Sequence, residues 1–314
     1  KTRQYDLGLD MDMFNYRLNV KLDYYYKYTS SLIYDIPIPG SLYAFGAQVE
    51  NAMEISNEGL ELELQADILR ESAVSWRMKF NMARNWNRFE KSYSGKDVVD
   101  GDGTLLVVGR PLNGLYVWAH RGYYNSDAEV PRLYKIDGQE IYFNGVATNG
   151  ISGAVGDYRL LDLDGDGNPD SYYAGSPLPL AHGGWVNELM WKNFDLNVLV
   201  NFTIGRKMIN NRMGLGFSRQ SEDGHLTKLF DYRKLRPWDG VNKKPNAPAW
   251  GNSLSMNTDS AIEKVHHLAL KQITLGYNLP DRISKKAGLS GVRFFLTAEN
   301  LFYLSNYSGG NPEV

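Results

Sequence analysis

The sequence predicts an all-β protein and, within that class, a portion of a transmembrane antiparallel β-barrel. Apolar and polar residues alternate strictly in several stretches of the 314-residue chain, and a period of two places each set on its own face of a strand. The connections between these stretches are short and long in turn. Short turns at one end and long loops at the other are typical of outer-membrane barrels, whereas a soluble sandwich rarely needs such long loops.

Four strands are expected in the first part of the chain. They cover approximately Arg3 to Asp12, Leu18 to Tyr28, Asn57 to Leu69 and Trp76 to Phe89. The third is the clearest, because every second residue from Leu60 to Ile68 is apolar and the residues between them are polar. Tight turns are expected near Phe14 and Ser72, and a long connection over 29–56. Pro37 within it is expected to prevent regular pairing, because proline has no N–H to donate.

Four more strands are expected after a very long connection over 90–181. They cover approximately Gly183 to Trp191, Phe194 to Ile204, Lys264 to Leu279 and Gly291 to Tyr303. A further long connection spans 205–262, and 90–181 is expected to contain a hairpin of its own near Leu115 to Tyr124. The parity of the connections predicts that 29–56, 90–181 and 205–262 are extracellular. Polar faces this rich in charge indicate a water-filled interior, so these eight or so strands are expected to belong to a larger barrel.

Composition excludes several classes of function. The net charge of −2 gives no basic surface for nucleic acid, and the absence of cysteine excludes disulfide scaffolds and thiolate chemistry. His266 and His267 are adjacent and would face opposite sides of a strand, so they do not form a zinc ligand pair. No nucleophile motif is present. Neither an enzyme nor catalytic residues are expected.

The sharpest local motif is an acidic loop between two expected strands. Its oxygen ligands follow the spacing of the first part of a calcium loop: Asp162, Asp164, Asp166, Asn168 and Asp170. Tyr173 replaces the usual bidentate glutamate and no helix flanks the motif, so it is not an EF-hand. Carboxylates this close repel one another, which favours a structural Ca²⁺ as the only cofactor. The alternative is an Asp/Gly turn that needs no ion.

Aromatic residues in the expected long loops allow three interpretations. They could stack on sugar rings, contact a partner that covers the barrel, or pack against one another. The residues concerned are Tyr43, Phe45, Tyr123, Tyr124, Trp238 and Trp250.

Several blocks of sequence, in this order, resemble the C-terminal barrel portion of SusC/RagA-type TonB-dependent transporters of Bacteroidetes outer membranes. They are Gln4 to Tyr28, Asn57 to Leu69, Gly156 to Asp170, Gly175 to Gly205, Leu270 to Pro280 and Leu289 to Val314. The resemblance implies a barrel of roughly twenty-two strands in the Gram-negative cell outer membrane. The plug, the TonB box and the final strand of that pattern are not found in the chain.

The resemblance also implies a function and partners. Such proteins import oligosaccharides or peptides, with a SusD-like surface lipoprotein as lid and with TonB acting through the N-terminal region. Contact with outer-membrane lipid and a dimer of transporter–lid pairs are implied too, whereas no residue of this chain is assigned to the substrate. The alternative is a soluble, calcium-stabilised β-sandwich that binds carbohydrate.

Overall fold

The computed structural model describes most of the chain. The described residues are 1–37, 47–70, 72–99, 105–130, 133–134, 140–141, 155–165, 170–210, 236–241, 244–249, 258–286 and 288–313. Contacts divide the chain into two compact units. The first unit comprises Lys1–Gly114, Ser176–Lys207 and Lys264–Tyr307, and the second comprises Leu115–Gly175, Met208–Glu263 and Ser308–Val314.

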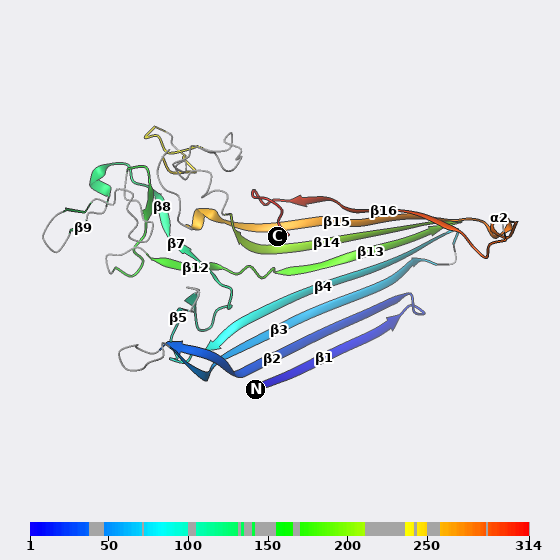
Figure 1. The fold of residues 1–314 in the computed structure, drawn as a ribbon, viewed down its shortest axis with the longest axis horizontal. Helices are drawn as coiled ribbons and strands as arrows, with labels where there is room; N and C mark the ends of the chain where they lie inside the picture. The colour runs from blue at the N-terminus through cyan, green and yellow to red at the C-terminus, as the bar shows by residue number, and fades with distance from the viewer. Residues whose placement is uncertain are drawn as a thin grey trace. The chain divides into compact units, whose positions relative to one another are not determined.

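The first unit is built on one eight-stranded antiparallel sheet, in which the strands follow one another in chain order (Figure 1). The strands are β1 (Thr2–Met13), β2 (Leu18–Pro37), β3 (Ala47–Leu69), β4 (Val74–Lys91), β13 (Ala181–Trp191), β14 (Phe194–Ile209), β15 (Ile262–Asn278) and β16 (Arg293–Ser305). β1 and β16 are the two edge strands of this sheet. The eight expected strands are therefore confirmed, and together they form an open portion of a barrel wall.

The expectation of an irregular connection over 29–56 is wrong for most of that range. β2 continues to Pro37 and β3 begins at Ala47, and these two residues pair with each other. Pro37 is tolerated because it is the last residue of its strand, where a missing N–H costs little. The register shifts between Thr29 and Ile33, and Ser31 adopts a φ of 54°, so an irregularity interrupts the alternation there.

The short connections contain the backbone conformations that tight turns need. Phe14, Asn15 and Tyr16 between β1 and β2 all have positive φ, and so does Lys192 between β13 and β14. Between β15 and β16 the chain forms a short helix, α2 (Asp281–Lys286), where only a turn was expected. No helix in the described part of the chain is long and apolar enough to cross a membrane.

A small hydrophobic core lies where the long strands β2, β3 and β4 meet the segment that follows them. Its buried members are Met53, Phe89, Val98 and Leu106. The hairpin of β5 (Val98–Val99) and β6 (Leu105–Leu106) supplies two of these residues. The backbone N–H of Phe89 donates to Arg110 (2.8 Å), and the N–H of Gly109 donates to Phe89 (2.7 Å). The first part of the 90–181 connection is thus fixed to β4.

The second unit consists of short strand pairs. β7 (Leu115–Trp118) pairs with β12 (Ser171–Gly175), β8 (His120–Tyr123) with β11 (Tyr158–Leu160), and β9 (Leu133–Tyr134) with β10 (Glu140–Ile141). The expected hairpin near 115–124 is wrong, because β7 and β8 do not pair with each other. Only the buried Ala119 separates them, which leaves no room for a turn.

Candidate functional site

The candidate functional surface is the polar face of the eight-stranded sheet. The register places Asp23 of β2 opposite both Gly8 of β1 and Glu61 of β3, and Asp67 opposite Arg77 of β4. Directly paired residues share a face, so the polar residues of neighbouring strands collect on one side. Members of this polar face include Asp6, Asp10, Lys21, Asp23, Tyr25, Glu61, Glu63, Asp67, Arg77, Lys79, Asn81, His182, Glu188, Asp195, Asn201, Thr274, Arg293 and Thr297.

The opposite face of the same sheet is apolar and exposed. Leu7 and Leu296 are each 73% exposed, although each belongs to a paired strand. Other exposed members of this apolar face are Leu9, Leu22, Leu60, Met82, Trp185, Phe194, Ile204, Leu275 and Phe294. A continuous apolar surface of this extent is typical of a lipid or protein interface. The sheet is therefore a wall with one lipid-type face and one wet face.

Ion pairs join neighbouring strands across the polar face. Arg77 Nε lies 2.7 Å from Asp67 Oδ1, and Lys79 Nζ lies 3.1 Å from Glu188 Oε1. The pairs thus connect β3 with β4 and β4 with β13. Because these side chains are partly exposed, each pair adds only a fraction of a kcal/mol to stability, of the order of 0.2–1 kcal/mol. Their main effect is to neutralise charge on the wall.

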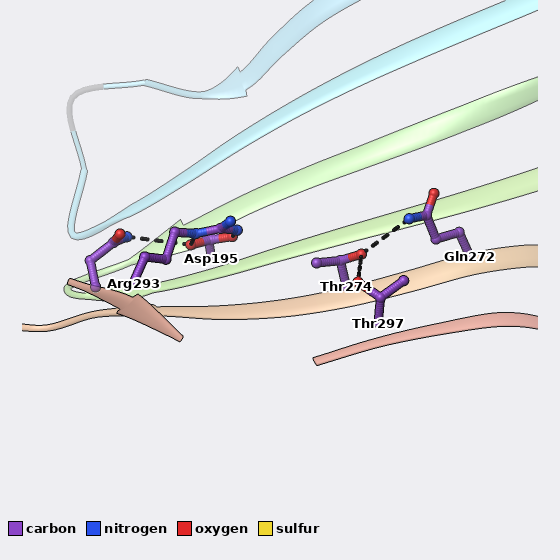
Figure 2. Close-up of polar contacts among 6 residues, drawn as sticks. Asp195, Gln272, Thr274, Arg293 and Thr297 are labelled. Atoms are coloured by element: carbon purple, nitrogen blue, oxygen red, sulfur yellow. Dashed lines mark hydrogen bonds and ion pairs between the residues drawn. The ribbon is translucent and has the colours of Figure 1, made fainter. Parts of the chain in front are cut away.

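A further ion pair spans an intervening strand. Arg293 of β16 donates from Nη2 to Asp195 Oδ2 (2.5 Å) and from Nε to Oδ1 (3.2 Å), although β15 lies between β14 and β16 (Figure 2). Gly276 of β15 makes this contact possible, because a Cβ there would clash with the Asp195 carboxylate and lie 2.6 Å from Arg293 Nη2. Asn278 Nδ2 also donates to Asp195 (3.3 Å).

Glycine has the same role elsewhere on the polar face, between β2 and β4. The Tyr25 ring lies across Gly59, where a Cβ would be 2.7 Å from Tyr25 Cζ, and Tyr25 Oη donates to Asn85 Oδ1 (3.0 Å). Beside this ring is an open hollow of about 700 Å³. Its lining includes Gln4, Asp6, Asp23, Lys27, Asn57 and Glu61. These groups can donate and accept hydrogen bonds, as the wall of an aqueous passage requires.

The structure brings together three of the five residues expected to bind calcium. Carboxylate oxygens of Asp162, Asp164 and Asp170 lie within 4.8 Å of one another, a spacing that a Ca²⁺ with ligands at 2.3–2.6 Å can bridge. Asp170 Oδ2 also accepts the N–H of Leu163 (2.6 Å). The two remaining candidates, Asp166 and Asn168, lie outside the described residues. The donor set fits the ion, and calcium binding stays a prediction.

Three of the loop aromatics pack within the second unit. Tyr124 is 6% exposed, and Tyr123 stacks on Tyr158 with ring centroids 5.5 Å apart. Burial raises the pKa of the Tyr123 and Tyr158 phenols, so both stay protonated well into the alkaline range. Trp238 donates from Nε1 to Asn125 Oδ1 (3.2 Å). All three side chains thus take part in packing within the loops.

The other three loop aromatics, Tyr43, Phe45 and Trp250, lie outside the described residues.

One polar cluster was not foreseen from the sequence. In the second unit His120 Nδ1 contacts Asp259 Oδ1, and the other carboxylate oxygen of Asp259 accepts from Tyr172 Oη (3.2 Å). The His120 ring also packs edge-on against Tyr158, 4.7 Å away. These contacts tie β8 to the 3₁₀ helix at Asp259–Ala261. Because His120 and Asp259 are 139 positions apart in the sequence, no sequence spacing signals the pair.

These features define a class of protein. An up-and-down antiparallel sheet with an exposed apolar face, a polar face and alternating short and long connections is a portion of a transmembrane β-barrel. The family of TonB dependent receptor-like β-barrels matches residues 1–174. The chain belongs to this family, which locates it in the outer membrane and excludes the alternative of a soluble sandwich.

Relatives support the SusC/RagA resemblance across the whole chain. The chain is 26% identical to TonB-dependent receptor P3 of Formosa agariphila, covering 100% of this chain and 30% of the relative. It is 25% identical to TonB-dependent receptor SusC of Bacteroides thetaiotaomicron, again covering 100% of this chain and 30% of the relative. These relatives are receptors rather than enzymes. The chain spans about a third of their length.

A solved structure shares the fold. The structure of the RagAB peptide transporter superposes with a TM-score of 0.72 at 23% identity, covering 98% of this chain and 32% of that chain. The fold of this chain therefore matches part of a chain about three times as long.

Proposed function

We propose that the chain supplies barrel wall and surface loops to a TonB-dependent importer of oligosaccharides or peptides. The observation that carries this proposal is the division of the sheet into an exposed apolar face and a charged polar face. In a closed barrel the first would contact lipid and the second would line a water-filled passage. The hollow beside Tyr25 and the polar side chains around it would let a hydrated nutrient exchange hydrogen bonds along the wall.

No bond-making step is needed for this activity. The wall would provide a polar route, while the energy for transport would come from TonB acting through the N-terminal region of the whole protein. Ion pairs such as Arg77–Asp67 and Lys79–Glu188 would limit the net charge that a passing solute meets. The chain's own residues would thus bind the solute weakly and guide it along the passage.

We further propose a SusD-like surface lipoprotein as the lid, and a dimer of such transporter–lid pairs as the assembly. The likeness to SusC and the fold shared with the RagAB peptide transporter support this partnership. The connections within 29–56, 90–181 and 205–262 would face outwards and meet the lid. The internal packing of Tyr123, Tyr124 and Trp238 would give the lid a preformed surface.

We also propose that Asp162, Asp164, Asp166, Asn168 and Asp170 hold a structural Ca²⁺ in one of these loops. Support comes from the 4.8 Å grouping of the three described carboxylates and from their ligand spacing in the sequence. The ion would neutralise repulsion between the carboxylates and fix the loop, without taking part in transport chemistry.

Uptake by cells that carry the intact transporter tests the proposed function. Fluorescent oligosaccharides and peptides too large for porins would be supplied to a strain with the transporter, to a deletion strain, and to a strain treated with a protonophore. We expect uptake of one solute class only in the first strain, and its loss on treatment with the protonophore. Equal uptake in all three, for both solute classes, would contradict the proposal.

The lid is tested separately by affinity purification of the tagged transporter from detergent-solubilised outer membranes. We expect a surface lipoprotein to co-purify in about a one-to-one ratio. Recovery of the transporter alone under conditions that preserve transport would contradict the partnership, while leaving the barrel assignment intact.

A further inference from the structure

The apolar face of the sheet ends abruptly on β4. Its side chains on this face run from Trp76 through Met78, Phe80 and Met82, and the next residues in the same alternation are Arg84 and Trp86. The register sets Arg84 opposite Leu60 and Trp86 opposite Glu58 on β3. The boundary between the apolar part of this face and its polar rim therefore passes between Met82 and Arg84.

Arg84 and Trp86 form a unit at this boundary. The guanidinium carbon of Arg84 lies 4.6 Å from the centroid of the Trp86 ring, and the indole itself is 37% exposed. Stacking on an indole holds the guanidinium plane in place and leaves its N–H fork free to donate at the edge. Exposed tryptophans at this level of a barrel wall lie among lipid headgroups.

Arg84 has no ion-pair partner among the described residues. Glu58 of β3 is the nearest acid by register. Its carboxylate accepts a hydrogen bond from Tyr24 Oη (3.1 Å) of β2, which flanks β3 on the side away from Arg84. The next cation on β4, Arg88, has its own partner, Glu90, at 3.6 Å. Within the described ranges no carboxylate oxygen lies within 4.0 Å of an Arg84 nitrogen. A positive charge with free donors thus faces the surroundings at the edge of the apolar band.

We propose that Arg84 and Trp86 bind the phosphoryl headgroup of an anionic lipid in the surrounding leaflet. A guanidinium fork matches two phosphate oxygens in a bidentate arrangement, and charge-assisted bonds of this kind are strong at a low-dielectric boundary. The acyl chains of the same lipid would lie along Met82 and Leu62, which pair with each other two residues further from the polar rim. The partner is thus a lipid recognised by its charge, separate from the nutrient and from the lid.

Native mass spectrometry of the intact transporter in non-ionic detergent tests the inference. Phosphatidylglycerol would be titrated against the parent protein and against R84Q, with phosphatidylcholine as the zwitterionic reference lipid. We expect R84Q to weaken binding of the first phosphatidylglycerol by about tenfold, the effect of losing one charge-assisted pair. Phosphatidylcholine has the same phosphodiester, but its ammonium group offsets the charge, so its binding should weaken by clearly less.

Controls make the result specific. R88Q removes a cation from the same face of β4 that already has a carboxylate partner, so it should keep the parent affinity. R84K keeps the charge and loses the fork, so an intermediate affinity is expected. Unchanged phosphatidylglycerol binding in R84Q, equal losses in R84Q and R88Q, or displacement of the lipid by excess inorganic phosphate would each overturn the proposal.

Discussion

Arg293 of β16 and Asp195 of β14 form a bidentate ion pair that crosses β15, the strand between them. The pair passes over Gly276 of β15, the residue whose missing Cβ leaves the space, and Figure 2 shows the two side chains meeting between their strands. On the same strand, Thr274 Oγ1 lies 3.0 Å from Thr297 Oγ1 of β16 and accepts from Gln272 Nε2 (3.3 Å). Three strands are thereby linked near their short-turn end.

Substitution of Gly276 should weaken this linkage. In G276A the new methyl group would displace the Asp195 carboxylate and the Arg293 guanidinium, so we expect a loss of about 1–3 kcal/mol in the free energy of unfolding of the intact barrel. Urea unfolding in detergent, followed by circular dichroism, measures it. The matched control is G291A, because a Cβ at Gly291 meets nothing within 4 Å. Equal stability of G276A and G291A would contradict the role of Gly276.

The ion pair itself should contribute little energy. The Arg293 and Asp195 side chains are 45% and 25% exposed, and pairs in such surroundings are screened by water. A double-mutant cycle with D195N and R293Q should therefore give a coupling below about 1 kcal/mol. A coupling several times larger would show that the pair is effectively desolvated.

Packing of Trp238 against Gly156 in the second unit can be tested with a pair of glycines. A Cβ at Gly156 would lie 2.5 Å from Ala249 Cβ and 2.7 Å from the Trp238 ring, whereas one at Gly122 would meet nothing within 4 Å, and both glycines have positive φ. G156A and G122A thus share the backbone strain and differ in the clash. The readout is hydrogen exchange at the Ala249 N–H, which donates to Gly156 O (2.9 Å).

We expect exchange at Ala249 to accelerate by about tenfold or more in G156A and by clearly less in G122A, because only the first variant disturbs the segment that protects this N–H. The same rate in both variants would mean that the close packing of Trp238 and Ala249 around Gly156 does not protect this N–H.

The acidic loop gives a prediction about calcium. The double substitution D164A/D170A removes two of the three grouped carboxylates and should abolish Ca²⁺ binding to the intact protein, measured by terbium luminescence and calorimetry. D127A, which removes an exposed acid elsewhere in the second unit, is the control. Calcium binding in D164A/D170A equal to that of the parent would refute the site.

Local alternation was sufficient to predict the strands. β14 is an example, since Val200, Phe202 and Ile204 alternate with the polar residues Asn201 and Thr203, with no glycine or proline among them. The same reasoning failed beyond Thr29, where the positive φ of Ser31 and the shift in register break the period of two. Pro37 then suggested a loop, although it ends a strand and its N–H is not needed there.

Contacts between distant residues could not be predicted from the sequence. Asp195 and Arg293 are 98 residues apart, and their contact depends on Gly276, a third residue on another strand. The acidic loop was visible because its ligands are close in sequence, and the structure indeed groups Asp162 with Asp164 and Asp170. Motifs of short range are therefore readable in advance, whereas the cross-strand chemistry of the wall depends on the register.

Cysteine labelling of intact cells tests the central claim that the sheet crosses the outer membrane with its long connections outside. The chain has no cysteine of its own, and Ala73 and Lys96 are exposed residues close to the two ends of β4. In the intact transporter, with any other cysteines replaced, a membrane-impermeant maleimide should label K96C in whole cells. It should label A73C only after the outer membrane is permeabilised. Labelling of both positions in whole cells, or of A73C alone, would contradict the account.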